Sequence, residues 1–507
     1  MGAMGAMGAM GAMGAMGAMG AMGAMGAMGA MGACERPSRA VPGDAGGGAV
    51  CAAARGRAFG GCCPAWTIAT ETGACRARPW ALPAKGDALG DAAARSLAVA
   101  VDTRGRALVG FASSAGLELL EESATGAWTL RHPGLAVGAV TPGDLVAGAD
   151  GTAAFTWLVG SGSAQTVFLS ERDAGGVWKE PASAADAFSF PTTAYAPRLA
   201  SAQGEWLLVW NQWMTTFDYG VQVARKRSAH EAWTRPADRD DVLSPRILFS
   251  NTPVVALDEA GQALITWYQS VGGPLMAFAS ERAGRDAAFT RPAPTDVLSA
   301  PGGAVDSDPV AAVKPALARD GAAAVAWTQE NGAGATLVYL ATRDAAGRWT
   351  RPRDLGDAFS LGTGYARGVQ LAFGPGGELV VVWYQDAGEG NAVYAARRRG
   401  DGTWAEGGRR PMRLSTAGVA GLYPRLAVGP EGGVLVAWTE RAGAGVMRVV
   451  ARRADGTGPW GPREGISPET GDDAELPAVA MGPRDRAVVA WAQGPGPAQR
   501  VYVARVE

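Results

Sequence analysis

The chain has 507 residues, a formal net charge of −2, 48% hydrophobic residues and 19% charged residues. This composition is typical of a globular protein with ample material for a core. The near-balanced charge argues against a nucleic-acid partner. The chain has only two histidines, which argues against histidine-based metal sites and serine–histidine–aspartate catalysis. We therefore predict no metal and no cofactor.

Residues 1–33 are eleven copies of Met-Gly-Ala, followed by Cys34. Without proline they cannot form a collagen helix, and each glycine disfavours an α-helix by about 1 kcal/mol. The apolar run ending in "MGAC" resembles a bacterial lipoprotein signal, which implies lipid attachment at Cys34. The resemblance predicts a cell-envelope protein, anchored in the outer membrane, or an extracellular one, with no other membrane contact. The alternative is an expanded DNA repeat or a misplaced start codon, and on either interpretation residues 1–33 lie outside the fold.

All cysteines precede residue 76: Cys34, Cys51, Cys62, Cys63 and Cys75. If Cys34 carries lipid, the other four suit two disulfides in an oxidising compartment. The pairing stays open, although the adjacent Cys62 and Cys63 are poorly placed to bond with each other. A small metal site is the alternative, but paired Cys-x-x-Cys hooks are absent from the sequence. We predict a tether and cysteine-rich segment over residues 34–74 and one domain over residues 75–507.

An aromatic motif recurs along this domain. A first tryptophan, preceded by a Val-rich run, recurs every 53 to 60 residues, and an earlier copy has Phe111 in its place. These tryptophans are Trp157, Trp210, Trp267, Trp327, Trp383, Trp438 and Trp491. A second aromatic residue follows each of them except the last, and one more follows Phe111: Trp128, Trp178, Trp233, Phe289, Trp349, Trp404 and Trp460. The repetition indicates one structural unit per copy.

Each copy reads as four short strands separated by Gly, Asp and Asn turns, so we predict an all-β fold, a β-propeller of four-stranded blades. Eight copies predict eight blades. The alternative is seven, with the irregular copy at 97–132 serving another purpose. The last copy ends after its third strand, and residues 75–84 carry the Trp-x-x-Pro frame of a fourth strand. We therefore predict that this N-terminal strand closes the ring and removes exposed sheet edges.

Turns such as "TRDAAGRW" and "ERDAGGVW" lie between the predicted third and fourth strands. They resemble, in degenerate form, the Asp-box of sialidase-like propellers. In the first of them, Thr342, Asp344 and Trp349 match the motif, whereas Gly347 is one place late. The resemblance covers the repeats from about residue 97 onward and implies architecture, not sialidase activity. A tight turn followed by a core tryptophan explains the pattern equally well.

Ligands of propellers usually bind at the face opposite these turns, so we looked for sites in the loops that enter each first strand. Three such loops pair a tyrosine with an arginine, a group suited to carboxylate or phosphate. These residues are Tyr195, Arg198, Tyr365, Arg367, Tyr423 and Arg425. One unusual loop, "NQWMTTFDYGVQ", adds Trp213, Asp218 and Tyr219, which suit sugar or peptide binding. The alternative is that all of these residues pack against neighbouring blades.

From these features we predict a monomeric binding or protein-interaction scaffold whose ligand is a protein or a glycan. The alternative is a sialidase-like glycoside hydrolase acting on extracellular glycans. Hydrolysis would need two carboxylates across an opening. Candidates occur in suitable loops, but no two of them stand out as a pair, so we assign no catalytic residue. They are Asp218, Glu330, Asp386 and Glu389.

Overall fold

The computed structural model describes residues 67–69, 75–84, 87–91, 96–134, 139–148, 150–162, 164–214, 219–248, 250–307, 312–386, 388, 390–405, 411–441 and 445–506. This part of the chain is almost entirely β structure. Its helices are single 3-10 turns, namely η1 (Ala184–Asp186), η2 (Leu355–Asp357), η3 (Pro483–Asp485) and η4 (Gly496–Ala498). Within the described ranges, no helix has the length and hydropathy to span a bilayer.

Each copy of the repeat forms an antiparallel unit in which strands that follow one another in the chain are paired. In the first four copies the strands are β5 (Leu97–Val101), β6 (Ala107–Ser113), β7 (Gly116–Glu122), β8 (Trp128–Arg131); β9 (Val140–Ala147), β10 (Ala153–Val159), β11 (Thr166–Arg172), β12 (Trp178–Lys179); β13 (Ala194–Ala202), β14 (Glu205–Trp213), β15 (Tyr219–Lys226); and β16 (Ser250–Leu257), β17 (Ala263–Ser270), β18 (Leu275–Arg282). The irregular copy at 97–132 thus forms a four-stranded sheet like the others.

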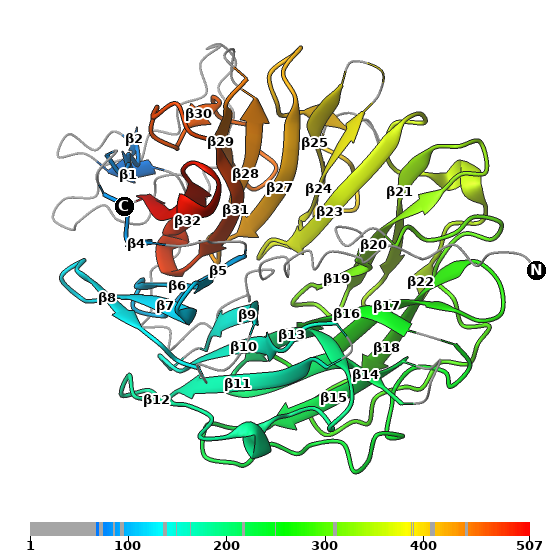
Figure 1. Ribbon diagram of the computed structural model, residues 1–507. Helices are drawn as coiled ribbons and strands as arrows, with labels where there is room; N and C mark the ends of the chain where they lie inside the picture. The colour runs from blue at the N-terminus through cyan, green and yellow to red at the C-terminus, as the bar shows by residue number, and fades with distance from the viewer. Residues whose placement is uncertain are drawn as a thin grey trace, which may run out of the picture.

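In the last four copies the strands are β19 (Lys314–Leu317), β20 (Ala323–Glu330), β21 (Thr336–Arg343), β22 (Trp349–Thr350); β23 (Tyr365–Phe373), β24 (Leu379–Asp386), β25 (Asn391–Arg398), β26 (Met412–Arg413); β27 (Gly421–Val428), β28 (Gly433–Arg441), β29 (Met447–Asp455), β30 (Glu464–Gly465); and β31 (Ala474–Met481), β32 (Ala487–Gln493), β33 (Arg500–Val506). Figure 1 shows the units following one another in chain order around a common centre.

The third and fourth copies depart from the predicted four strands, because each has only three named strands in the described residues. A single bridge between Arg225 and Thr234 replaces the fourth strand in the third copy. In the fourth copy one backbone hydrogen bond remains, from the Thr290 amide to the Glu281 carbonyl. The proline of "WTRP" does not account for the shortening, because the same sequence at 349–352 forms β22.

The N-terminal segment pairs with the last copy, but over a shorter stretch than predicted. β3 (Trp80–Ala81) pairs antiparallel with β33, with Trp80 opposite Val506, and β4 (Gly90–Asp91) pairs with the start of the same strand. β2 (Cys75–Ala77) pairs instead with β1 (Thr67–Ala69). Pro79 separates β2 from β3 and has no amide hydrogen, so the predicted strand over 75–84 is divided in two. The blue and red ends of the described chain meet here in Figure 1.

Only Cys75 of the five cysteines lies among the described residues, in β2. The predicted lipidation at Cys34 and the predicted disulfide partners Cys51, Cys62 and Cys63 lie outside them.

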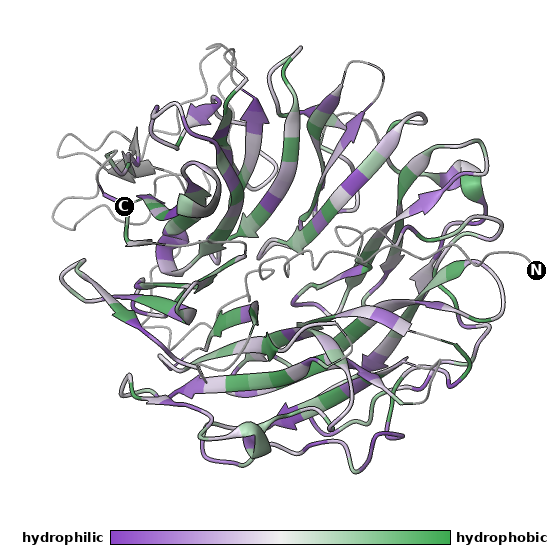
Figure 2. Cartoon of the chain, viewed as in Figure 1, coloured by the Kyte–Doolittle hydropathy of each residue, from purple (hydrophilic) through white to green (hydrophobic). Residues whose placement is uncertain are grey.

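The first aromatic of every copy is a core residue: Phe111 and all seven tryptophans have 0% exposure. In several units the tryptophan lies opposite an aromatic residue of the third strand and stacks on it, as Trp267 does on Phe278 at 5.9 Å between ring centroids. Figure 2 shows apolar residues along the middle of the strands and polar residues toward their ends and the loops. The burial explains why an aromatic recurs at this position.

The glutamine two residues after each of five of these tryptophans links the core to a loop. Trp327 Nε1 donates to Gln329 Oε1 at 3.0 Å, and Gln329 Nε2 donates to the carbonyls of Ala300 and Gly303 at 2.6 and 2.8 Å. The same tryptophan–glutamine bond recurs at Trp210, Trp267, Trp383 and Trp491. Repetition of this side chain is therefore structural, because it satisfies buried polar groups in unit after unit.

The first strands of successive units pack against one another around the centre. β9 contacts β5 and β13, β23 contacts β19 and β27, and β31 contacts both β27 and β5. Most of these strands carry a bulge at the same place, where two residues are skipped in the pairing with the second strand. In four bulges the first skipped residue is non-glycine with positive φ: Ala196, Thr252, Tyr423 and Leu476. A bulge re-aims the side chains beside it, which matters for the site below.

Candidate functional site

When the units are aligned on the core aromatic, one position recurs in every first strand. In most units its residue lies opposite the residue just before that aromatic, whereas in β9 it lies within the bulge. Arg198 lies opposite Val209, and Arg425 lies opposite Ala437 in the same way. Across the copies this position holds Ala98, Asp144, Arg198, Val254, Lys314, Gln370, Arg425 and Ala478. Four of the eight residues are charged, which is unusual for an interior strand.

The four charged residues are buried and act on one another. Asp144, Arg198, Lys314 and Arg425 have exposures between 4% and 9%. Although they come from β9, β13, β19 and β27, the charges of Arg198, Arg425 and Asp144 all act on Lys314. Figure 1 shows these strands around the same centre. We call these residues the central cluster.

Burial dominates the electrostatics of the central cluster. Desolvation, reinforced by repulsion from Arg198 and Arg425, lowers the pKa of Lys314 to about 7. Desolvation also lowers the pKa of Arg425 to about 10, again with a contribution from Arg198. The pKa of Asp144 is raised because burial outweighs the attraction of Arg198 and Lys314 and a backbone hydrogen bond from Leu199. The cluster thus holds charges that solvent does not stabilise.

Only part of the hydrogen-bonding capacity of the central cluster is used within the protein. The Asp144 carboxylate accepts from the Leu199 amide at 2.9 Å, and its other oxygen lies 3.9 Å from Arg198 Nη1. Arg198 and Arg425 each donate to the carbonyl of the preceding proline, at 2.9 and 3.3 Å. Asp144 Oδ1 and Arg425 Nε have no hydrogen-bond partner among the described residues. Arg198 and Lys314 act on the Asp144 carboxylate, and Arg425 acts on Lys314. A cluster with more cations than carboxylates can hold an incoming anionic group in place.

Arg198 and Arg425 were predicted from sequence and both belong to the central cluster, whereas Arg367 does not join them there. Arg367 lies on β23, before the bulge and opposite Tyr384, and it is half-buried. Among the described residues, its charge is not one of those that act on Lys314. The residue of β23 at the equivalent position is the buried Gln370. Arg367 therefore lies on the other side of the bulge from the positions that Arg198 and Arg425 occupy.

The three predicted tyrosines occupy different environments. Tyr195 donates to the Ser250 carbonyl at 3.3 Å, and burial together with nearby Tyr219 raises its pKa well above the usual value. Tyr423 packs against Tyr384 with ring centroids 5.7 Å apart. Tyr365 is 55% exposed. Tyr195 and Tyr423 therefore make contacts between neighbouring strands, while Tyr365 stays accessible.

The last residue of β14, Trp213, and the first residue of β15, Tyr219, form a small aromatic group with Tyr195. The Tyr219 ring lies 4.5 Å from that of Trp213 and 4.9 Å from that of Tyr195, edge-on in both cases. Trp213 and Tyr219 are half-buried. Asp218 lies outside the described residues. This group joins β13, β14 and β15 at the end of the sheet where the entry loops lie.

Sequence reasoning missed Asp144 and Lys314. Both occur in segments that lack the Tyr-x-Arg pattern, "TPGDLVA" and "AAVKPALA". Aligning the first strands on the core tryptophan, rather than on a motif, would have placed both residues level with Arg198. Such an alignment shows a charged residue at a strand position that is apolar in other units, and a charge at such a position indicates a candidate functional site.

No protein-family model matches the chain, and no curated protein matches it. Several solved structures resemble it. A protein of unknown function from Dyadobacter fermentans is 14% identical and covers 62% of this chain and 94% of its own, with a TM-score of 0.36. The polysaccharide lyase Uly1 is 9% identical over 70% of this chain and 87% of its own, with a TM-score of 0.46. Trypanosoma rangeli sialidase in complex with sialic acid is 10% identical over 76% and 56%, with a TM-score of 0.36. Identities this low say nothing of activity.

Proposed function

We propose that this chain is a ligand-binding β-propeller that takes an anionic group of its ligand, a carboxylate, sulfate or phosphate, into the central cluster. The observation that carries the proposal is the burial of Arg198, Lys314 and Arg425, whose charges act on one another, while Asp144 is the one acid that acts on Lys314 among the described residues. A buried excess of positive charge costs folding free energy, and a bound anion offsets that cost. The guanidinium groups also match the geometry of carboxylates and tetrahedral oxyanions.

For the architecture we propose eight blades, with β3 supplying the fourth strand of the last one. Two observations support this. The strands of each sequence copy pair antiparallel with one another, although a parallel contact between β21 and β23 joins the fifth and sixth copies into one sheet. In addition, β31 of the last copy contacts β5 of the first. A ring of blades places equivalent residues of the first strands around one axis, which is the arrangement that the central cluster needs.

Glycoside hydrolysis remains the alternative function, and no observation on this chain favours it over binding. A glycosidase needs two carboxylates. Among the described residues, the charges that act on the Asp144 carboxyl are those of Arg198 and Lys314, and neither is an acid. The glycan-active names among the similar structures fit a binding protein as well as a hydrolase. Release of reducing sugar that is lost in Asp144→Asn would favour the hydrolase.

Calorimetric titration of the full chain tests the proposed function. The probes are inorganic sulfate and glucuronic acid, with glucose as the neutral control. We expect saturable binding of at least one anion and none of glucose. The double variant Arg198→Gln/Arg425→Gln should lose affinity by at least tenfold, since each charge-assisted hydrogen bond is worth about 1.5–3 kcal/mol. Arg348→Gln is the control, because Arg348 is 83% exposed on a distant turn and pairs with Asp344. Wild-type affinity in the folded double variant would refute the proposal.

For cellular location we propose export and lipid anchoring through Cys34. The support is the apolar run that ends at this residue. Metabolic labelling with radioactive palmitate, compared between the wild type and Cys34→Ala, tests it. Equal labelling of the two chains, or none in either, would contradict it.

A further inference from the structure

The central cluster holds one amine, that of Lys314. This residue lies opposite the residue just before the core tryptophan of its unit, as Arg198 and Arg425 do in theirs. The first strands of both flanking units pack against β19, but their residues at this level, Val254 and Gln370, carry no charge. The charges that act on Lys314 belong to units that do not flank it. The amine is therefore directed toward the common centre and not toward a neighbouring strand.

The Lys314 amine is available to a ligand. Within the described part of the chain its state depends on burial and on charges, and no hydrogen bond contributes to it. The Asp144 carboxylate is engaged instead by the Leu199 amide at 2.9 Å and by Arg198 at 3.9 Å. Lys314 also keeps 5% exposure, whereas the core tryptophans have 0%. Its side chain is therefore not sealed in the core.

The surroundings of Lys314 also make its amine a nucleophile. Burial and repulsion from Arg198 and Arg425 lower the pKa of Lys314 to about 7. Roughly half of these amines are therefore neutral at pH 7, against less than about 0.1% for an ordinary lysine with a pKa of about 10.4. A neutral amine has a free lone pair, and lysines desolvated beside another cation are suited to form imines with carbonyl compounds.

We propose that Lys314 forms a reversible imine with a small 2-oxo acid whose carboxylate is held by Arg198 and Arg425. The proposal rests on the anion site proposed above and adds a covalent step to it. In a 2-oxo acid the carbonyl carbon is bonded directly to the carboxylate. Binding of that carboxylate by the two arginines therefore brings the carbonyl to the amine on which both of them act. The arginines stay charged and bind both carboxylate oxygens, which leaves the lysine free to react.

The covalent step needs no further reactant. The lone pair of Lys314 Nζ forms a bond to the carbonyl carbon, the carbonyl π pair moves to oxygen, and a proton passes from nitrogen to that oxygen. The C–O bond of this carbinolamine then breaks as nitrogen forms the C=N bond, and the hydroxyl group leaves as water with the second amine proton. Nothing is oxidised or reduced. Asp144 is the acid that acts on Lys314, and it can relay these protons.

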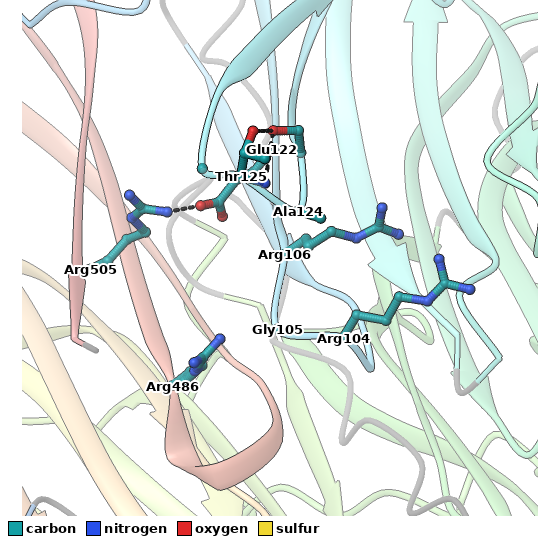
Figure 3. A pocket seen from close by; sticks show the side chains of 10 residues that line it. Arg104, Gly105, Arg106, Glu122, Ala124, Thr125, Arg486 and Arg505 are labelled. Atoms are coloured by element: carbon teal, nitrogen blue, oxygen red, sulfur yellow. Dashed lines mark hydrogen bonds and ion pairs between the residues drawn. The ribbon is translucent and has the colours of Figure 1, made fainter.

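A different group of arginines provides a control. These arginines line a pocket of about 400 Å³ between the first and the last unit. Figure 3 shows Arg505 paired with Glu122, while the guanidinium groups of Arg104 and Arg106 point away from Arg486. None of the described residues that line this pocket is a lysine. Because the pocket has neither converging guanidinium groups nor an amine, loss of its arginines should not affect a reaction at Lys314.

Reductive trapping on the full chain tests the proposal. The protein is incubated at pH 7.5 with glyoxylate and cyanoborohydride, which reduces an imine to a stable secondary amine. Peptide mapping by mass spectrometry then gives the rate at each of the four lysines, which are Lys85, Lys179, Lys226 and Lys314. The exposed Lys179 is the internal reference. Acetaldehyde, which has the carbonyl group but no carboxylate, is the control probe.

We expect glyoxylate to modify Lys314 at least tenfold faster than Lys179. In Arg198→Gln/Arg425→Gln the ratio of the glyoxylate rate to the acetaldehyde rate at Lys314 should fall at least tenfold, because the carboxylate loses its charge-assisted hydrogen bonds. Use of the ratio cancels any change in the reactivity of the amine itself. Arg104→Gln/Arg486→Gln removes the same charge elsewhere and should leave the ratio unchanged.

Trapping at Lys314 that is no faster than at Lys179, or an unchanged ratio in the folded Arg198→Gln/Arg425→Gln variant, overturns the proposal. Circular dichroism checks the folding of that variant. If it does not fold, competition in the wild type replaces it: acetate should slow glyoxylate trapping at Lys314 and not at Lys179, and the absence of slowing overturns the proposal. Saturable anion binding in the calorimetric titration without trapping at Lys314 would refute the imine alone, whereas the absence of both would also refute the anion site.

Discussion

Lys314 offers the sharpest test of the central cluster, because its charge is both buried and opposed by its neighbours. Burial, with repulsion from Arg198 and Arg425, lowers its pKa from 10.5 to about 7, while Asp144 partly offsets this. Between pH 7 and 10.5 the unfolded chain therefore binds a proton that the folded chain does not. Unfolding is favoured as the pH falls through this range, so the stability of the folded protein rises with pH.

The magnitude follows from the same pKa difference. About 3.5 pKa units at about 1.36 kcal/mol each amount to a penalty of about 5 kcal/mol at pH 6, where Lys314 is protonated in both states. At pH 9 the folded state holds a neutral amine, and the penalty falls to about 2 kcal/mol. Lys314→Met removes the charge and keeps an unbranched side chain. It should therefore stabilise the protein by about 5 kcal/mol at pH 6 and by about 2 kcal/mol at pH 9.

Urea denaturation of the wild type and Lys314→Met at pH 6, 7, 8 and 9, in buffers without sulfate or phosphate, measures this difference. The comparison removes contributions from other titrating groups that the two chains share. The variant should also bind anions more weakly at the central cluster, since it lacks one of three cations. A stability difference that does not change with pH, or a variant less stable than the wild type at pH 6, would refute our account of the cluster.

Three further substitutions test how the units are held together, each by urea denaturation. The Glu205 carboxylate is fully buried and lies 2.8 Å from Arg282 Nη1. Glu205→Gln removes its charge and should lower the free energy of unfolding by about 3–5 kcal/mol. A loss below about 1 kcal/mol would mean that the ion pair is dispensable. Gln329→Leu leaves Trp327 Nε1 and two loop carbonyls without their hydrogen bonds. The free energy of unfolding should fall by about 1–3 kcal/mol for each buried group left unsatisfied. An unchanged urea midpoint would show that water replaces the amide. Trp80→Ala should lower stability by about 1–3 kcal/mol, because the half-buried ring packs on the last sheet; no loss would mean that this N-terminal strand contributes nothing to the fold.

Local patterns in the sequence were enough to identify the repeating unit. A tryptophan that ends a Val-rich run predicts a buried strand, and its burial in every copy follows from that local pattern. The same applies to the N-terminal segment, where Trp80 in a Trp-x-x-Pro frame marked the strand that pairs with β33. The extent of that strand was wrong, since Pro79 interrupts it. These features depend on residues close together in the chain, which sequence periodicity can detect.

The composition of the central cluster was decided by tertiary structure. Asp144 and Arg425 are separated by most of the domain, and they act on the same lysine only because the first strands surround one centre. The bulge then decides which residue of each strand takes the inward position, so that Arg198 joins the cluster while Arg367 does not. Sequence by itself determined that charged side chains occur near the starts of the first strands. Which of them meet depends on backbone geometry and on the packing of distant strands, neither of which leaves a local pattern.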